Sequence, residues 1–256
     1  MSAGPEPLMQ VLDQFAAAGA RLIGVAGAQG SGKSTLAAAW AARTPGAIAL
    51  SLDDFYLTRA AREALGARLH PLCAVRGPPG THDLGLLEAT LDALLGAGTG
   101  HVPVFDKARD DRAPALRAVS GVGIVVLEGW CVGALGSARI DDPAPLNARE
   151  ANEDPGGVWR RWSARALLGP YQGLWRRCDR ILHLAAPDWS VVPGWRLEQE
   201  VRAGRALEGD ANAQARIDAF CALYERVTRS MLEGATRADV TARLDAARNV
   251  VSTAQG

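Results

Sequence analysis

Short apolar runs and segments of helical spacing alternate along this chain. Four apolar runs have the length of buried strands, at residues 22–26, 47–52, 123–127 and 180–184. Apolar side chains at helical spacing predict helices between or before them, at residues 8–15, Lys33–Arg43 and 84–95. Strands that alternate with helices are typical of βαβ units. The pattern therefore predicts an α/β fold with a central parallel sheet.

Two long irregular stretches, residues 66–83 and 141–157, interrupt this rhythm. Proline is frequent in both, and loops of this length in a compact domain are usually functional or mobile. The last third of the chain is predicted to be helical. Six apolar side chains there follow helical spacing and are assigned to the core: Ile217, Phe220, Cys221, Tyr224, Val227 and Met231. A weak alternation over residues 240–251 predicts one last strand.

Composition and charge exclude several classes of protein. The chain has 256 residues, of which 48% are hydrophobic, and 28 basic residues balance 28 acidic ones. A net charge of zero disfavours binding to nucleic acid through a broad basic surface. The longest apolar runs have seven residues, whereas a membrane span needs about 20. No Lys or Arg precedes Arg21, unlike a secretory signal. Four widely spaced cysteines match no metal motif and predict free thiols in the cytoplasm.

The strongest motif is GAQGSGKS at residues 27–34, between a predicted strand and a predicted helix. It fits GxxxxGK[ST], in which glycines turn backbone N–H groups toward phosphate oxygens and the helix adds its positive end. Lys33 would reach the β- and γ-phosphates, and Ser34 would bind Mg²⁺. The expected nucleotide contacts are Gly27, Ala28, Gln29, Gly30, Ser31, Gly32, Lys33, Ser34 and Thr35. The guanine-reading motif Asn-Lys-x-Asp is absent from the sequence, which favours ATP over GTP. The cofactors predicted are therefore ATP and Mg²⁺.

Carboxylates follow two of the predicted strands. Asp53 and Asp54 come after the second, and Glu128 ends the third. Ligands of open α/β sheets bind beyond the carboxyl ends of the strands. A kinase needs a group that accepts the acceptor's proton, and either Asp53 or Asp54 suits this role, while the other would cap the next helix. Glu128 is predicted to bind Mg²⁺ with Ser34.

Six further segments carry a family resemblance: SLDDFYLT at 51–58, HPL at 70–72, RGPPGTHD at 76–83, FDKARDDR at 105–112, LEGWC at 127–131 and WRLEQE at 195–200. With the phosphate loop, they resemble the phosphoribulokinase, uridine kinase and pantothenate kinase group, and most closely D-glycerate 3-kinases. The resemblance covers about residues 21–202. It implies a P-loop NTPase fold of three layers in a single kinase domain over 1–256. An N-terminal helix lies within 1–20, and the resemblance implies a helical lid at 190–210 followed by C-terminal helices.

The resemblance also implies an activity and roles for particular residues. The activity is transfer of the γ-phosphoryl group of ATP to D-glycerate, giving 3-phosphoglycerate. The resemblance implies that Asp53 is the base. It also implies that Arg196, which shares the lid segment with Arg202, is a catalytic arginine over the γ-phosphate. Because glycerate is a small anion, a fixed cation should hold its carboxylate. The expected substrate contacts are Asp53, Tyr56, Arg76, His82, Asp83, Lys107 and Arg112, with Arg109 a further candidate cation.

Two other functions remain open on the sequence. One is a sibling kinase for a larger acceptor, such as a nucleoside like uridine, or pantothenate. The other is an ATP-binding regulatory protein without catalysis, against which the intact Lys33, Ser34, Asp53 and Glu128 argue. The partner expected is a small molecule, with no nucleic acid and no membrane. The sequence does not indicate an oligomeric state.

Overall fold

A six-stranded sheet forms the centre of the computed structural model, which describes residues 6–207 and 209–256. The strand order is β10-β9-β8-β1-β7-β2. All neighbouring pairs are parallel except β9 and β10, which form an antiparallel hairpin. The strands are β1 (Leu22–Gly27), β2 (Ala47–Ser51), β7 (Ile124–Gly129), β8 (Arg180–Ala185), β9 (Val240–Leu244) and β10 (Val250–Gln255).

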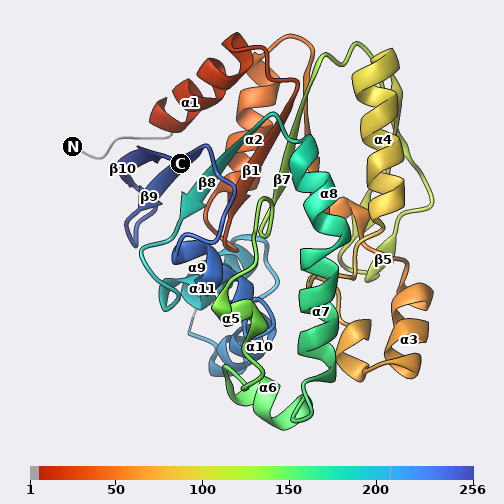
Figure 1. Ribbon diagram of the computed structural model, residues 1–256, viewed down its shortest axis with the longest axis vertical. Coiled ribbons are helices and arrows are strands. Elements are labelled where there is room, and N and C mark those ends of the chain that lie inside the picture. Colours follow the sequence, from red (N-terminus) through yellow and green to blue (C-terminus); the bar gives the residue numbers. More distant parts are fainter. Residues whose placement is uncertain (1–5, 208) are drawn as a thin grey trace.

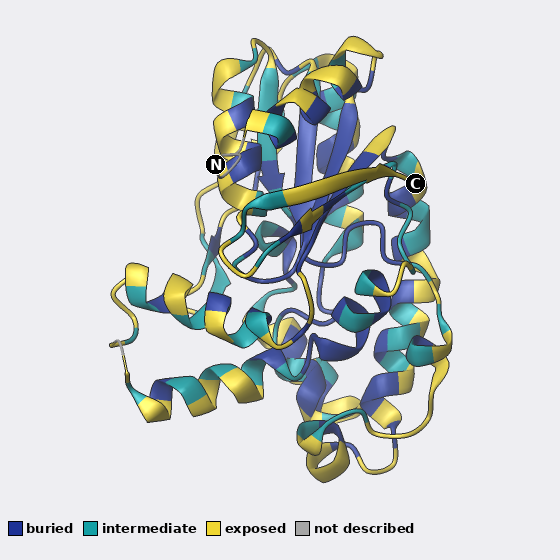
Figure 2. Ribbon diagram, turned by 90° about the vertical axis from the view of Figure 1, so that its left-hand side faces the viewer, coloured by how far each residue is buried: buried dark blue, intermediate teal, exposed yellow. Residues whose placement is uncertain are grey.

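Helices cover both faces of this sheet, so the predicted α/β fold with three layers is confirmed. Figure 1 shows α1 (Glu6–Ala17) and α2 (Lys33–Arg43) on one side, and α4 (Leu84–Ala97) and α8 (Pro170–Arg177) on the other. Helix α2 packs Leu36 and Trp40 into the core, and α4 packs Leu87 and Leu91. In Figure 2 the inner strands are buried, whereas β10 at the edge is largely exposed.

The other helices gather beyond the carboxyl ends of the parallel strands, at the bottom of Figure 1. They are α3 (Arg59–Arg68), α5 (Ala138–Asp141), α6 (Ala148–Glu153), α7 (Val158–Leu168), α9 (Val191–Arg202), α10 (Ala211–Cys221) and α11 (Glu225–Leu232), with the 3₁₀ helices η1 (Leu52–Phe55) and η2 (Pro71–Ala74). Figure 2 shows α9 and α10, on either side of residue 208, extending together from the body. Two short antiparallel pairs follow α4: β3 (Gly100–Val102) with β6 (Arg117–Val119), and β4 (Phe105–Asp106) with β5 (Asp111–Arg112).

The four predicted strands and three predicted helices are all present, with ends that shift by at most two residues. Residue 52 belongs to η1 rather than to the second strand. Residues 1–5 of the predicted N-terminal segment lie outside the described residues. The predicted last strand at 240–251 is instead two strands, because these residues form β9 and the start of β10. In the described residues no helix is long and apolar enough to cross a membrane.

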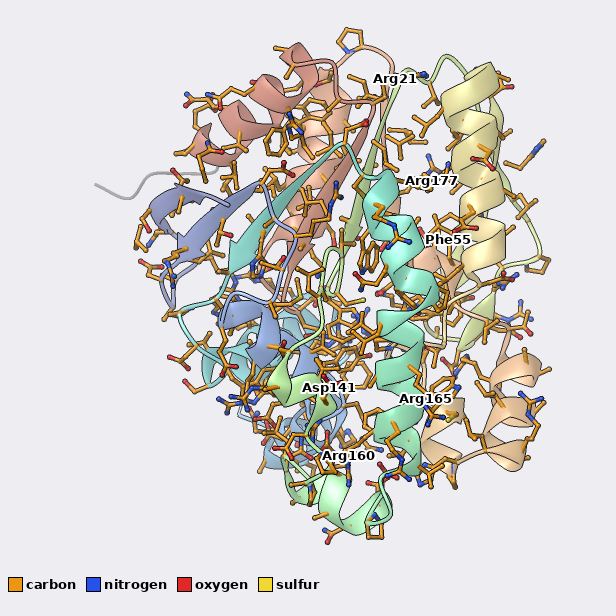
Figure 3. All side chains as sticks on the ribbon, viewed as in Figure 1. Arg21, Phe55, Asp141, Arg160, Arg165 and Arg177 are labelled. Atoms are coloured by element: carbon orange, nitrogen blue, oxygen red, sulfur yellow. The ribbon has the colours of Figure 1, made fainter. Side chains whose placement is uncertain are left out.

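The expectation of two irregular stretches is wrong in part. Residues 66–83 contain the end of α3 and η2, and residues 141–157 contain α6. Asn147 caps this helix by accepting the N–H of Glu150 at 3.0 Å. The buried Glu150 carboxylate pairs with Arg226 at 2.6 Å. Arg160, labelled on α7 in Figure 3, donates to the carbonyls of Asp154 and Pro143 at 2.7 and 2.9 Å. Buried polar contacts with distant helices, rather than apolar spacing, organise this segment.

The four cysteines are free and buried, as expected. Of the six side chains predicted as core in the last third, Cys221, Tyr224, Val227 and Met231 are buried. Ile217 and Phe220 are only partly buried. Phe220 and Tyr224 also contribute to the cleft described below, which the helical spacing did not indicate.

Candidate active site

The phosphate loop joins the buried strand β1 to α2 at the carboxyl edge of the sheet. Gly32 immediately precedes α2 and has a φ of 91°, a left-handed conformation that favours glycine. Lys33 turns back over the loop, with Nζ 3.4 Å from the carbonyl oxygen of Ala28. Among residues 6–207 and 209–256, the buried atoms Gln29 Oε1 and Ser31 Oγ have no hydrogen-bond partner. A ligand with both donors and acceptors would satisfy them.

Ser34 and Glu128 meet beside the loop. Ser34 Oγ donates to Glu128 Oε1 at 2.9 Å, and Glu128 is only 5% exposed. The parallel register causes this meeting, because Glu128 in β7 lies opposite Val25 of β1 and Ser51 of β2. The two oxygen ligands predicted for Mg²⁺ are therefore adjacent, at the edge where ligands of such sheets bind.

Asp53 lies in η1, directly after β2, and faces the same cleft. Its Oδ1 accepts the hydroxyl of Tyr56 at 2.7 Å, and its Oδ2 accepts Lys107 Nζ at 2.9 Å. Burial raises the pKa of Asp53, but the charge of Lys107, the hydrogen bonds from Lys107 and Tyr56, and the charge of Lys33 outweigh burial and hold this pKa below its ordinary value. Asp53 is therefore ionised at neutral pH.

Asp54 points to a different partner. Its Oδ1 accepts the backbone N–H of Phe105 at 3.0 Å, which ties η1 to β4. Burial and the neighbouring charge of Asp53 raise the pKa of Asp54, although the Phe105 hydrogen bond opposes them. The expectation that one of the two aspartates caps a helix is wrong, since Thr58, and not Asp54, caps α3.

Arg76 reaches the cleft from the RGPPGTHD loop. Its guanidinium lies over the Phe105 ring, 5.7 Å from the centroid, and pairs with Asp110. The next residue, Gly77, has a φ of 117°, and a Cβ there would lie 1.7 Å from the Tyr224 hydroxyl. Tyr224 therefore packs directly on this loop, and its hydroxyl donates to the carbonyl oxygen of Arg76 at 3.2 Å.

Arg196 enters the cleft from α9. It pairs with Glu200, donates to Gln199 Oε1 at 3.0 Å, and its guanidinium lies 5.4 Å from the centroid of the Phe220 ring. Together these segments enclose one cleft between the phosphate loop and the C-terminal helices. Its lining residues are Gln29, Lys33, Ser34, Ser51, Asp53, Tyr56, Arg76, Lys107, Glu128, Trp130, Arg196, Gln199, Phe220 and Tyr224.

Three of the residues expected to bind substrate lie behind Tyr56 and outside this lining. His82 stacks on the Tyr56 ring at 4.6 Å, and its Nδ1 lies 2.6 Å from the Tyr171 hydroxyl. Asp83 caps α4 and pairs with Arg112 at 2.7 Å. Arg112 Nε also donates to the carbonyl oxygen of Tyr56 at 2.8 Å. Burial lowers the pKa of His82 to about 4, so it is neutral at pH 7. These three residues support Tyr56, the partner of Asp53.

Five residues that line the cleft have no functional role predicted from the sequence: Ser51, Trp130, Gln199, Phe220 and Tyr224. Ser51, Trp130 and Gln199 stand inside the segments that carry the resemblance, so they could have been found there. Phe220 and Tyr224 follow a helical apolar pattern that is the same for a core residue and for a cleft wall. Only their packing against Arg196 and Gly77 reveals the difference.

Comparison with known proteins points to kinases. No family model matches the chain. The uncharacterised kinase mug58 of Schizosaccharomyces pombe is 32% identical over 197 residues, which cover 70% of this chain and 69% of the relative. The "Probable ATP-dependent kinase TDA10" of Saccharomyces cerevisiae is 28% identical over 227 residues, 79% of this chain and 74% of the relative.

Solved structures share the fold. A D-glycerate 3-kinase from Cryptococcus neoformans superposes with a TM-score of 0.80 over 100% of both chains, at 24% identity. The YGR205w protein has a TM-score of 0.68, covers 98% of this chain and 95% of its own, and is 25% identical. The first likeness, at this low identity, concerns the fold alone.

Proposed function

This chain belongs to the P-loop kinase family of the fission yeast kinase mug58, and within that activity we propose that it transfers the γ-phosphoryl group of ATP to a hydroxyl of D-glycerate, giving 3-phosphoglycerate. The observation that carries the proposal is the cationic half of the cleft. Arg76, Lys107 and Arg196 line it together with Asp53. A small hydroxy acid needs both a cation for its carboxylate and a base for its hydroxyl.

The phosphate half of the cleft fits ATP with Mg²⁺. The unpartnered hydroxyl of Ser31, the left-handed Gly32 and the flexible ammonium of Lys33 suit a polyphosphate. Ser34 and Glu128 would hold Mg²⁺, since both offer oxygen ligands and already lie 2.9 Å apart. When bound, Mg²⁺ would neutralise charge on the phosphate oxygens.

Asp53 would orient the acceptor hydroxyl and take its proton as the oxygen bonds to the γ-phosphorus and the bond to the ADP oxygen breaks. Its low pKa keeps it ionised before the reaction. Tyr56 and Lys107 fix the direction of the carboxylate through its two oxygens. Arg76 would hold the acceptor's carboxylate as a planar fork, and Arg196 would stabilise charge on the γ-phosphate.

A coupled assay of ADP release tests the proposal. The purified chain is supplied with ATP and Mg²⁺ and a panel of acceptors: D-glycerate, L-glycerate, glycerol, uridine and pantothenate. The expected result is the highest kcat/KM with D-glycerate, with 3-phosphoglycerate identified by ³¹P NMR. Preference for uridine or pantothenate would support a sibling kinase instead. ATP binding without turnover of any acceptor would support a regulatory role.

A further inference from the structure

The turn between β9 and β10 carries an arginine that the proposed mechanism does not use. Arg248 has a φ of 70°, a left-handed conformation uncommon for a residue with a Cβ. Asp245 holds the turn: its carbonyl accepts the N–H of Arg248 at 2.9 Å, and its carboxylate accepts the backbone N–H of Asn249 at 2.8 Å. A strained residue kept in place by its surroundings indicates that its side chain has a defined task.

The Arg248 side chain joins the phosphate loop to α9. Its Nε donates to the carbonyl oxygen of Gly30 at 2.6 Å, and its Nη2 donates to Glu198 Oε2 at 2.8 Å. The guanidinium also lies over the Trp195 ring, 4.9 Å from the centroid. One side chain thus contacts the loop expected to hold phosphate and two residues of α9.

Helix α9 also rests directly on the phosphate loop at this point. Gly30 has a φ of 76°, and a Cβ there would lie only 2.6 Å from Trp195 Cβ and 2.7 Å from the Trp195 backbone. Trp195 Nε1 donates to the carbonyl oxygen of Ala246, in the same turn as Arg248, at 2.8 Å. The residue after Trp195 is Arg196, which lines the cleft. Successive residues of a helix point about 100° apart, so Trp195 can anchor the helix while Arg196 faces the cleft.

We propose that Arg248 is a positioning residue that fastens α9 to the phosphate loop and thereby holds Arg196 over the γ-phosphate of ATP. The proposal rests on the proposed function only through the place given to Arg196. A comparison of ATP with ADP, which has no γ-phosphate, distinguishes this role from a purely structural one. Loss of Arg248 should weaken ATP binding more than ADP binding, whereas a general loosening of the phosphate loop would weaken both alike.

The test is direct titration of the 256-residue chain with ATP and with ADP, each with Mg²⁺ and without an acceptor. Arg196→Ala should lower the ratio of ATP to ADP affinity about 10-fold, the size of one lost charge-assisted contact. Arg248→Ala should lower this ratio about 3- to 10-fold. Arg248→Lys should recover only part of the lost ratio, because an ammonium cannot span Gly30 and Glu198 as a planar guanidinium does. Arg243→Ala removes the same charge from an exposed position of β9 and should leave the ratio unchanged.

The double variant decides whether Arg248 acts through Arg196. If it does, Arg196→Ala with Arg248→Ala should lower the ratio no more than about 2-fold beyond Arg196→Ala alone, because coupled residues are not additive. Three results would each overturn the proposal. The two single-variant losses could multiply in the double variant, Arg248→Ala could lose ATP and ADP affinity equally, or Arg196→Ala could leave the ratio unchanged. Alanine and arginine share the cost of the left-handed backbone, so folding should survive. Because no acceptor is present, failure of the glycerate assay would not affect this result.

Discussion

Replacing Arg76 with alanine tests the acceptor half of the cleft most directly. The Arg76 side chain is 23% exposed, and one of its terminal nitrogens pairs with Asp110 while the ring of Phe105 supports its face. The remaining N–H groups are available to a carboxylate in the cleft. A charge-assisted pair of this kind contributes roughly 1.5–3 kcal/mol. Arg76→Ala should therefore raise KM for D-glycerate about 10–150-fold.

The surroundings of Arg76 predict that this variant folds and still binds ATP. Asp110 keeps a second cation, because Arg62 lies 3.0 Å from its carboxylate. The phosphate loop belongs to a different segment, so KM for ATP should change little. Arg76→Lys should recover only part of the loss, since lysine lacks the planar fork. Arg109, a further candidate cation in the sequence, is exposed in the turn between β4 and β5 and outside the cleft lining. Arg109→Ala is therefore a matched control and should leave KM for D-glycerate unchanged.

The assay is steady-state ADP release with varied D-glycerate or glycerol at saturating ATP. Glycerol lacks the carboxylate and should be a poor substrate of the wild type. Arg76→Ala should narrow the gap between glycerol and glycerate. A variant that separates the two acceptors as sharply as the wild type would refute the role of Arg76 as the carboxylate clamp. Lys107, which lines the same cleft, would then be the next candidate, and the kinase assignment would stand.

Three further predictions concern the phosphate loop, the two aspartates and a buried histidine. Lys33→Ala should lower kcat about 10²-fold or more, because charge on the transferred phosphoryl group loses a cation; retention of a tenth of the rate would contradict the loop assignment. Asp53→Asn should lower kcat roughly 10²–10⁴-fold with ATP affinity unchanged, and Asp54→Asn should cost less; the reverse order would exchange their roles. Burial lowers the pKa of His183 to about 4, so the unfolded chain binds the extra proton below pH 6.5 and stability falls as pH drops. Between pH 7 and pH 5 the unfolding free energy of His183→Leu should fall by roughly 1–2 kcal/mol less than that of the wild type, as measured by urea denaturation. An equal fall in both proteins would disprove this.

Much of the phosphate half of the site could be predicted from local sequence. The loop at 27–34 needs only glycines, a lysine and a serine between a strand and a helix, and all of these are neighbours in the chain. Glu128 ends an apolar strand, and parallel pairing with β1 and β2 brings it to Ser34. The periodicity of apolar residues predicts the strands and helices, and the ends of the parallel strands define the edge of the sheet where the loop and Glu128 lie.

The acceptor half depends on contacts between distant segments. The sequence left Asp53 and Asp54 equivalent until the resemblance favoured one, and the fold separates them because Lys107 approaches the first and the backbone of Phe105 the second. The segments that carry the resemblance include Arg76 and also His82, Asp83 and Arg112. Of these four residues, only Arg76 lines the cleft.

By itself the sequence determined the α/β fold and the phosphate loop, because these depend on short-range patterns of apolar, glycine and charged residues. Its resemblance to known kinases indicated the kinase class. Only the tertiary structure decided which side chains face the cleft. Phe220 in α10 and Tyr224 in the turn before α11 follow an ordinary helical apolar pattern, and only their packing against Arg196 and Gly77 makes them part of the cleft wall. Arg248 meets Gly30 across 218 positions of sequence. No local periodicity encodes such a contact, because it forms only when the sheet brings its last hairpin beside its first loop.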